Sequence, residues 1–337
     1  MKRVNVGIIG CGAIAESEHI PNILSISQAK LVSICDINET ILNEIGDRFN
    51  IRDRYVNYEE LIERKDIEAV IIATPAPTHA EIVLKSLNRG KKVFVEKPIT
   101  VSISDAENIV NLSRKVDLPV MVGYQLRFLP NHQKVKDFIR KKIVGQIYTA
   151  RIRAETLVIK PAETLLIDYA THFFDLMSWY FDTEKIESIV GTVKEDEKKA
   201  QVASTTILNY TSGFYSTIET IWVPKFNWGI VSRFFEVVGE NGKISTDTSG
   251  PRISLWRASS LRDRVLGVKS FNPRETVNSF MPLSDYCYRE ELKAFVDSII
   301  GNKPVPVTAE DGLKALKIAD ATFQSYKQKT LIQTNGL

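Results

Sequence analysis

The amino-acid sequence predicts an α/β protein with two domains, an N-terminal doubly wound parallel sheet and a C-terminal α+β domain with a mostly antiparallel sheet. The chain has 337 residues, which is too long for one typical hydrophobic core. Its first third alternates short β-branched apolar runs with helical patterns, as parallel sheets covered on both faces do. Near residue 145 the pattern changes to strand-like runs joined by turn signals.

The first third contains five apolar runs that we expect to form one parallel sheet. Amphipathic segments separate them, and the segment 78–90 ends at a glycine, as a helix C-cap does. The expected strands are 4–10, 30–36, 68–74, 91–96 and 118–123.

The second part begins with an alternating segment, 146–155, followed by an apolar helical pattern over 163–181. We expect this helix to cover one face of an antiparallel sheet, which leaves the other face for a subunit interface. The expected domains are 1–123 and 124–337, and the late helix 309–327 is a candidate to pack back on the first domain. Further expected elements are strands 185–193, 202–210, 214–223, 233–246 and 252–258, and a helix over 285–300.

Composition argues against several classes of partner. The net charge is only +3 and no Lys/Arg cluster interleaves with aromatic residues, so no nucleic acid is expected. No apolar run approaches the roughly 18–20 residues that cross a bilayer, so no membrane is expected. The cysteines Cys11, Cys35 and Cys287 are widely spaced and form no CxxC pair, which fits a reducing cytoplasm.

A glycine motif, Gly10-Cys11-Gly12-Ala13-Ile14-Ala15, directly follows the first expected strand. In this G-x-G-x-x-A form, the first glycine permits a tight turn and the second lets the backbone approach a pyrophosphate at a helix N-terminus. Asp36 ends the second strand about twenty residues on, where a carboxylate accepts hydrogen bonds from ribose hydroxyls and repels a 2′-phosphate. The motif predicts NAD as cofactor, with NADP as the alternative and a glycine turn without ligand as the competing interpretation.

Lys97 follows a buried strand in the sequence Val95-Glu96-Lys97-Pro98. A lysine at the carboxyl end of a strand in an open parallel sheet points toward the ligand crevice. A solvated surface lysine is the competing interpretation.

The apolar helix 165–181 carries Asp168, His172 and Asp175 at spacings that place them on one face. A satisfied polar pair in a core, a metal site and an acid/base pair facing a cleft are the three interpretations. A metal site needs three or four converging ligands, and the other histidines occur elsewhere in the chain, so no metal is expected. Asp175 is expected to serve the fold.

Several motifs, taken in order, resemble the Gfo/Idh/MocA family of oxidoreductases, which includes inositol and sugar dehydrogenases. The resemblance implies an N-terminal Rossmann domain, a C-terminal open-faced α/β domain, NAD or NADP, and dimers or tetramers. It also implies a catalytic set of Lys97, Asp168 and His172, and a Lys97–Pro98 peptide that is often cis. The motifs are the glycine fingerprint, Asp36, Ala73-Thr74-Pro75 with His79, Glu96-Lys97-Pro98, 123–128 (GYQLRF), Asp168-x-x-x-His172 and 307–316 (VTAEDGLKAL).

The chemistry of alcohol oxidation favours the acid/base interpretation of the helix. The cofactor takes a hydride, and the protein must position the substrate and handle the hydroxyl proton. The ordinary pKa of histidine, about 6.5, suits reversible proton transfer by His172, and Asp168 one turn away would orient the ring. Lys97 would hydrogen-bond the reacting oxygen or relay the proton. Either Lys97 or His172 could be the immediate base.

Further positions are expected at the cofactor or substrate. His79 either contacts the cofactor or begins a helix without contact, and Arg127 either contacts ligand or forms an interdomain salt bridge. The expected cofactor contacts are Gly10, Gly12, Ala13, Ile14, Asp36, Ile37, Thr74, Pro75, His79, Glu96, Lys97 and Gln125. The candidates for the substrate wall are Arg127, Arg153, Tyr169 and Trp228.

These features predict an NAD(P)-dependent dehydrogenase or reductase acting on a secondary alcohol or carbonyl of a sugar, polyol or related cyclic substrate. One alternative is a nucleotide-sugar or amino-sugar dehydrogenase of a biosynthetic pathway. Another is a non-catalytic NAD(P)-binding redox sensor, which would have no need of the full catalytic set.

Overall fold

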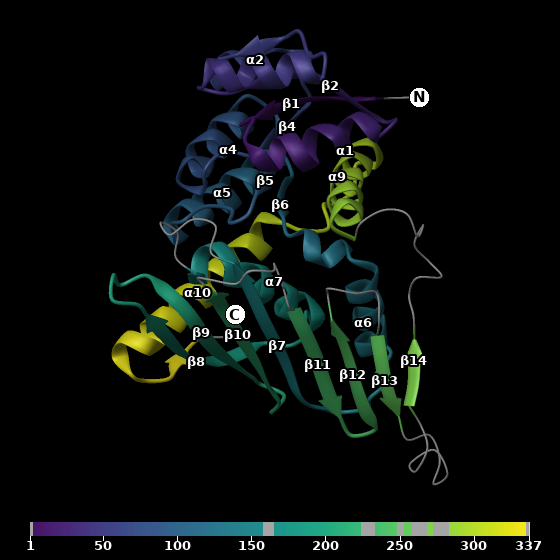
Figure 1. Cartoon of the computed structure of the whole chain (residues 1–337), viewed down its shortest axis with the longest axis vertical. Coiled ribbons are helices and arrows are strands. Elements are labelled where there is room, and N and C mark those ends of the chain that lie inside the picture. Colours follow the sequence, from purple (N-terminus) through teal and green to yellow (C-terminus); the bar gives the residue numbers. More distant parts are fainter. Residues whose placement is uncertain are drawn as a thin grey trace. The chain divides into compact units, whose positions relative to one another are not determined.

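A computed structural model of the chain describes residues 3–157, 165–223, 233–247, 253–257, 268–271, 283–334 and 337. The described residues belong to two compact units. The first unit spans residues 1–128 and 281–316, and the second spans residues 129–280 and 317–337. Each unit contains one sheet (Figure 1).

The sheet of the first unit has six parallel strands in the order β3-β2-β1-β4-β5-β6. This is the doubly wound order, so the predicted fold class is confirmed. The winding reverses between β1 and β4, and in such sheets ligands bind at the carboxyl ends of the strands at this point. The strands are β1 (Val4–Ile9), β2 (Ala29–Cys35), β3 (Arg54–Tyr55), β4 (Ala69–Ile72), β5 (Lys92–Glu96) and β6 (Val120–Gly123).

Helices cover both faces of this sheet. In Figure 1, α1 and α9 lie together on one side of the strands, and α4 and α5 lie on the other. Asn38 and Ser102 begin two of the helices by accepting hydrogen bonds from backbone N–H groups of the first turn. The helical elements are η1 (Ala15–His19), α1 (Ile20–Ser25), α2 (Glu39–Arg48), α3 (Tyr58–Glu63), η2 (Ala76–Thr78), α4 (His79–Asn88), α5 (Ile103–Val116), η3 (Gln125–Phe128) and α9 (Leu283–Gly301).

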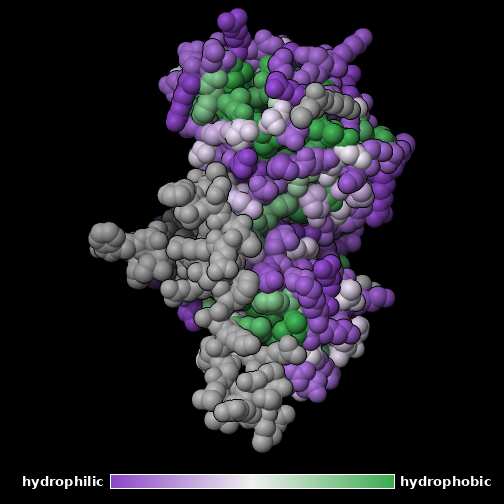
Figure 2. Space-filling view, turned by 90° about the vertical axis from the view of Figure 1, so that its right-hand side faces the viewer, coloured by the Kyte–Doolittle hydropathy of each residue, from purple (hydrophilic) through white to green (hydrophobic). Residues whose placement is uncertain are grey.

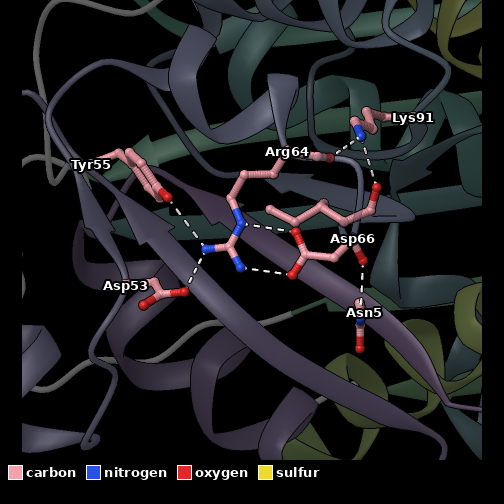
Figure 3. Close-up of polar contacts among 7 residues, drawn as sticks. Asn5, Asp53, Tyr55, Arg64, Asp66 and Lys91 are labelled. Atoms are coloured by element: carbon pink, nitrogen blue, oxygen red, sulfur yellow. Dashed lines mark hydrogen bonds and ion pairs between the residues drawn. The ribbon is translucent and has the colours of Figure 1, made fainter.

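A polar network joins the edge strand β3 to the amino ends of β1 and β5 (Figure 3). The Arg64 guanidinium donates two hydrogen bonds to the Asp66 carboxylate, at 3.0 and 2.7 Å, and a third to Asp53 at 2.6 Å. The buried Lys91 ammonium donates to the carbonyl oxygens of Arg64 and Ile67 at 2.6 and 2.9 Å. These contacts connect β3, which pairs with the last residues of β2, to the segments that precede β4 and β5.

The second unit contains a nine-stranded sheet in the order β14-β13-β12-β11-β7-β10-β9-β8-β15. Among the described strands of this second sheet, only the β7–β10 pair is parallel, so the sheet is mostly antiparallel, as predicted. The expected strand 233–246 is a hairpin of two strands that turns at Asn241. The strands are β7 (Ile147–Leu157), β8 (Ile186–Glu195), β9 (Gln201–Tyr210), β10 (Tyr215–Val223), β11 (Arg233–Gly239), β12 (Gly242–Asp247), β13 (Ile253–Arg257), β14 (Val268–Phe271) and β15 (Ile332–Gln333).

Helices pack on one face of this sheet (Figure 1). The Tyr180 ring at the end of α7 contacts the ring of Phe235, with centroids 4.4 Å apart, and Thr322 of α10 lies 3.1 Å from the Thr206 hydroxyl. On this inner face Ile218 is buried, whereas its strand neighbour Thr217 on the outer face is half-exposed. The helical elements are α6 (Pro130–Arg140), η4 (Leu166–Ala170), α7 (Thr171–Tyr180) and α10 (Ala309–Gln328), of which 309–316 fall in the first unit.

The described surface is predominantly polar on the face drawn in Figure 2, where hydrophobic residues occur in separate areas. Among the described residues, no helix is long and apolar enough to cross a membrane. The three cysteines are buried, and none of them forms a disulfide bond within the described part of the chain.

Candidate functional site

The phosphate-loop candidate lies between β1 and η1. Gly10 has a φ of +95°, and a Cβ there would lie 2.6 Å from the carbonyl oxygen of Ala73, so only glycine fits. At Gly12 a Cβ would meet no atom within 4 Å, so the backbone is open there. Ala13 and Ile14 begin the helix, whose first N–H groups have no partner within the helix itself. This geometry fits a bound pyrophosphate.

Asp36 lies directly beside this loop, after the last residue of β2. One carboxylate oxygen accepts the N–H of Cys11 at 2.8 Å, and the other accepts the N–H of Asn38 at 2.8 Å. A carboxylate has about four acceptor positions, so Asp36 keeps capacity for ribose hydroxyls. The next residue, Ile37, is 91% exposed and offers an apolar surface beside it. These features fit the adenosine end of a dinucleotide.

The end of β4 carries Thr74 and Pro75, and His79 begins α4 shortly after. The His79 ring is 1% exposed, and its two nitrogens lie 2.7 Å from the Thr74 carbonyl oxygen and 2.8 Å from the Pro98 carbonyl oxygen. Backbone carbonyls therefore occupy both nitrogens of this predicted cofactor-binding histidine.

The end of β5 carries Glu96 and Lys97, and the Lys97–Pro98 peptide is cis. The Glu96 carboxylate contacts Nε2 of His19 at 2.8 Å and accepts the backbone N–H of Lys97 at 3.1 Å. Burial raises the pKa of Glu96, but the hydrogen bond and charge of His19 and the charge of Lys97 outweigh it, so the net pKa is lowered. Glu96 is thus a buried carboxylate beneath the lysine, and the Lys97 side chain is half-exposed.

Gln125 and Arg127 follow β6. The Gln125 amide donates to the hydroxyl of Tyr288 at 3.1 Å, and its buried carbonyl oxygen has no partner among the described residues. That oxygen is available to a ligand amide. Arg127 is 5% exposed and pairs with Asp311 at 3.0 Å. This salt bridge lies within the first unit, so it is not the interdomain salt bridge that was expected.

The second unit carries Asp168, Tyr169 and His172 on one helix. Residues 166–170 form a π-helical turn and α7 continues from Thr171, so Asp168 and His172 flank the junction. His172 is 8% exposed, and Tyr169 is 7% exposed and packs edge-on against Phe173 with ring centroids 5.1 Å apart. Such π-turns occur frequently at functional sites.

Arg153 is not brought together with these residues. Its neighbours in β7, Ile152 and Ala154, are buried under the helices, so Arg153 lies on the outer face and pairs with Glu155 and Glu219 at 2.8 and 3.8 Å. Trp228 lies outside the described residues.

Sequence reasoning did not identify His19 and Tyr288 as neighbours of Glu96. The rings of His19 and Tyr288 meet edge-on, 6.2 Å apart, and Tyr288 also holds Gln125. The available signal was a histidine four residues after the glycine motif, at a helical spacing from the apolar Ala15 and Ile23.

Two family models match the chain. The model described as an oxidoreductase family with an NAD-binding Rossmann fold matches residues 4–124. The model described as the C-terminal alpha/beta domain of the oxidoreductase family matches residues 159–334. The predicted nicotinamide dinucleotide cofactor and the predicted enzyme class are confirmed by these matches.

Individual relatives span nearly the whole chain. The chain is 26% identical to the myo-inositol 2-dehydrogenase of Thermotoga maritima over 345 residues, covering 98% of each protein. It is 30% identical to oxidoreductase P35 of Formosa agariphila over 260 residues, covering 72% of this chain and 79% of that one. A solved levoglucosan dehydrogenase in complex with NADH and levoglucosan shares the fold, with a TM-score of 0.87, 19% identity, and coverage of 98% of this chain and 99% of that one. The chain belongs to the Gfo/Idh/MocA family of oxidoreductases.

Proposed function

We propose that this oxidoreductase transfers a hydride between NAD and a secondary alcohol or carbonyl of a sugar, polyol or related cyclic substrate. The observation that carries the proposal is the position of Lys97. Lys97 directly follows β5, and it lies at the same edge of the parallel sheet as the Gly10 turn and Asp36. The myo-inositol and levoglucosan enzymes among its relatives support a cyclic polyol or anhydrosugar as substrate.

The residues that would hold the dinucleotide belong to the first unit. The Gly10–Ile14 loop would bind the pyrophosphate, and Asp36 and Ile37 would contact the adenosine. The carbonyl oxygen of Gln125 would accept a hydrogen bond from an amide group of the dinucleotide. When bound, NAD supplies the hydride acceptor or donor.

The proton chemistry belongs to three side chains of the protein. His172 accepts the hydroxyl proton during oxidation, and Asp168 orients its imidazole and stabilises the imidazolium. Lys97 hydrogen-bonds the reacting oxygen and offsets the charge that develops on it.

Removal of the proposed catalytic side chains tests this function. Lys97→Ala and His172→Ala should each lower kcat by about 10²–10⁴-fold, because general acid–base groups contribute that much. Binding of NADH, measured by fluorescence titration, should change by less than about threefold. Lys92→Ala, at the other end of β5, is the matched control. Near-normal turnover in both Lys97→Ala and His172→Ala would contradict the proposal.

A panel of substrates distinguishes this function from the two alternatives, a biosynthetic nucleotide-sugar or amino-sugar dehydrogenase and a redox sensor. Polyols, aldoses, anhydrosugars and nucleotide-linked sugars should be tested with oxidised cofactor. Turnover only with nucleotide-linked sugars would favour a biosynthetic enzyme. Tight binding of NADH with no turnover on the whole panel would favour a redox sensor.

We also propose that the two units act as a cofactor domain and a substrate domain, and that the outer face of the nine-stranded sheet joins subunits into a dimer or tetramer. A reducing cytoplasm suits the three free cysteines. Burial raises the pKa of Cys11 to about 12, so this thiol beside the phosphate loop stays protonated and takes no redox role.

A further inference from the structure

The ring of His79 spans the carboxyl ends of two neighbouring strands. One ring nitrogen lies 2.7 Å from the carbonyl oxygen of Thr74, which follows β4. The other lies 2.8 Å from the carbonyl oxygen of Pro98, which follows Lys97 at the end of β5. The ring is 1% exposed, so water does not compete for either contact. A single side chain therefore connects the β4 turn to the peptide that follows the proposed catalytic lysine.

Carbonyl oxygens only accept hydrogen bonds, so each of these contacts is a hydrogen bond only when the ring nitrogen concerned carries a proton. A neutral imidazole donates from one nitrogen, and only the doubly protonated ring donates from both. Burial lowers the pKa of His79 more than the two carbonyl contacts and the charge of Glu96 raise it, so the net pKa is lowered and the neutral ring donates to one carbonyl oxygen at a time. The ring is thus engaged by backbone on both sides and has no ring nitrogen left for a cofactor.

The peptide that precedes the lysine side chain is held in the same way. The Glu96 carboxylate accepts the Lys97 N–H at 3.1 Å, and its other oxygen contacts His19 at 2.8 Å. His19 is fully buried and belongs to the π-helical turn η1. The His79 side chain therefore contacts the backbone that follows Lys97, and the Glu96 side chain, itself held by His19, contacts the backbone N–H of Lys97.

We propose that His79 is a positioning residue for Lys97, acting through the Pro98 carbonyl, and that the Glu96–His19 pair acts on the Lys97 N–H from the other side. This inference rests on the catalytic role proposed for Lys97. A lysine held at both flanking peptides presents its ammonium in one place, and a displacement of about 1 Å at a reacting group costs on the order of 10²-fold in rate.

Two substitutions of His79 separate positioning from cofactor binding. His79→Leu removes both ring contacts to the carbonyl oxygens, and His79→Gln keeps one amide donor of similar reach. The matched control is Ser86→Ala, which lies on the same helix, is fully buried, and has a hydroxyl with no partner among the described residues. For each variant we would measure the melting temperature, the NADH dissociation constant, kcat, and the pH dependence of kcat.

Positioning predicts a specific combination of changes. His79→Leu should lower kcat about 10–100-fold and shift the pH profile, with NADH binding within about threefold of the parent. His79→Gln should recover part of kcat, and Ser86→Ala should leave kcat unchanged. An NADH dissociation constant raised tenfold with kcat intact would overturn the proposal in favour of a cofactor ligand. A lower melting temperature with normal kcat and pH profile would overturn it in favour of a purely structural role.

A second measurement does not depend on turnover. The rate of acetylation of Lys97 by acetic anhydride, followed by peptide mass spectrometry across pH, reports the ionisation and access of the amine of this half-buried residue. The exposed Lys115 serves as an internal standard. If His79 positions Lys97, His79→Leu should change the pH dependence of Lys97 acetylation and leave that of Lys115 unchanged. Identical pH dependences of Lys97 acetylation in the parent and the variant would contradict the proposal. A changed curve in a protein that oxidises no substrate would uphold positioning while the proposed function fails.

Discussion

At the scale of single residues, Asp36 has two tasks. Its carboxylate orders the phosphate loop by accepting the Cys11 N–H, and it keeps acceptor positions for a ribose. Asp36→Asn preserves the shape and removes the charge that repels a 2′-phosphate. Because hydrogen bonds to charged groups contribute about 1.5–3 kcal/mol, we expect NADH binding to weaken roughly tenfold or more. The preference for NADH over NADPH should fall by a similar factor, as fluorescence titration with both cofactors would show.

The control for this prediction is another carboxylate near the same loop. Glu44 of α2 lines the same surface depression as Gly12 and Arg48, so Glu44→Gln removes an equal charge without touching the loop. An equal loss of cofactor preference in Glu44→Gln would indicate that general charge, rather than contact of Asp36 with the ribose, sets the preference.

At the scale of elements, the packing of α6 on α7 depends on a buried histidine. His132 is fully buried, and its Nδ1 shares a hydrogen bond with the hydroxyl of Tyr180. Burial, and then the charge of Arg233, lowers the pKa of His132 from 6.5 to about 3. Below pH 6.5 the unfolded chain binds a proton that the folded chain excludes until about pH 3, so stability is lost as the pH falls through this window.

This linkage predicts that the second unit loses roughly 2 kcal/mol of unfolding free energy between pH 6.5 and pH 4.5 through His132 alone. Urea unfolding followed by tryptophan fluorescence measures it, because all four tryptophans fall within the residue range of this unit. His132→Gln keeps a partner for Tyr180 and should flatten the pH dependence by about that amount. An equally steep dependence in the variant would assign the acid sensitivity to other groups.

Sequence patterns predicted the helices and strands well where neighbouring residues in the sequence determine the structure. Continuous apolar runs gave five strands of the parallel sheet within about two residues, and the ends of those strands placed the Gly10 turn, Asp36 and Lys97 at one edge. The π-turns at 15–19 and 166–170 were not expected, because one extra residue in a helical turn leaves no mark on apolar periodicity.

Contacts between distant segments were harder to predict. Alternation in β7 shows that Arg153 and Ala154 face opposite ways, but only the packing of α7 decides which face is inside. His19 and Glu96 are 77 residues apart, and no local pattern pairs them. The position of His79 at the start of a helix was predicted. Its contacts with two carbonyl oxygens were not, because they depend on how the segments after β4 and β5 lie relative to each other.

At the scale of the whole molecule, the outer face of the nine-stranded sheet is the surface proposed to join subunits. Ile207, Thr217 and Arg151 form a row across three strands, and all three side chains remain at least partly exposed in the single chain. Arg151 pairs with Glu236 at 2.9 Å and lies over the ring of Phe234 at 5.4 Å. A sheet face that mixes apolar side chains with ordered ion pairs matches the apolar core and polar rim of subunit interfaces.

A charge placed in the middle of that face should separate the subunits. Ile207→Asp combined with Thr217→Asp places two neighbouring carboxylates in the buried face if the face is an interface, with Arg151 beside only one of them, and their desolvation and mutual repulsion cost far more than a typical interface tolerates. Sedimentation velocity should then change from a dimer or tetramer to a single chain. Leu24→Asp, at a 50% exposed apolar position on α1, is the control and should leave the mass unchanged. The proposed interface would be excluded by an assembly that keeps its mass in the double variant, or that dissociates only in Leu24→Asp.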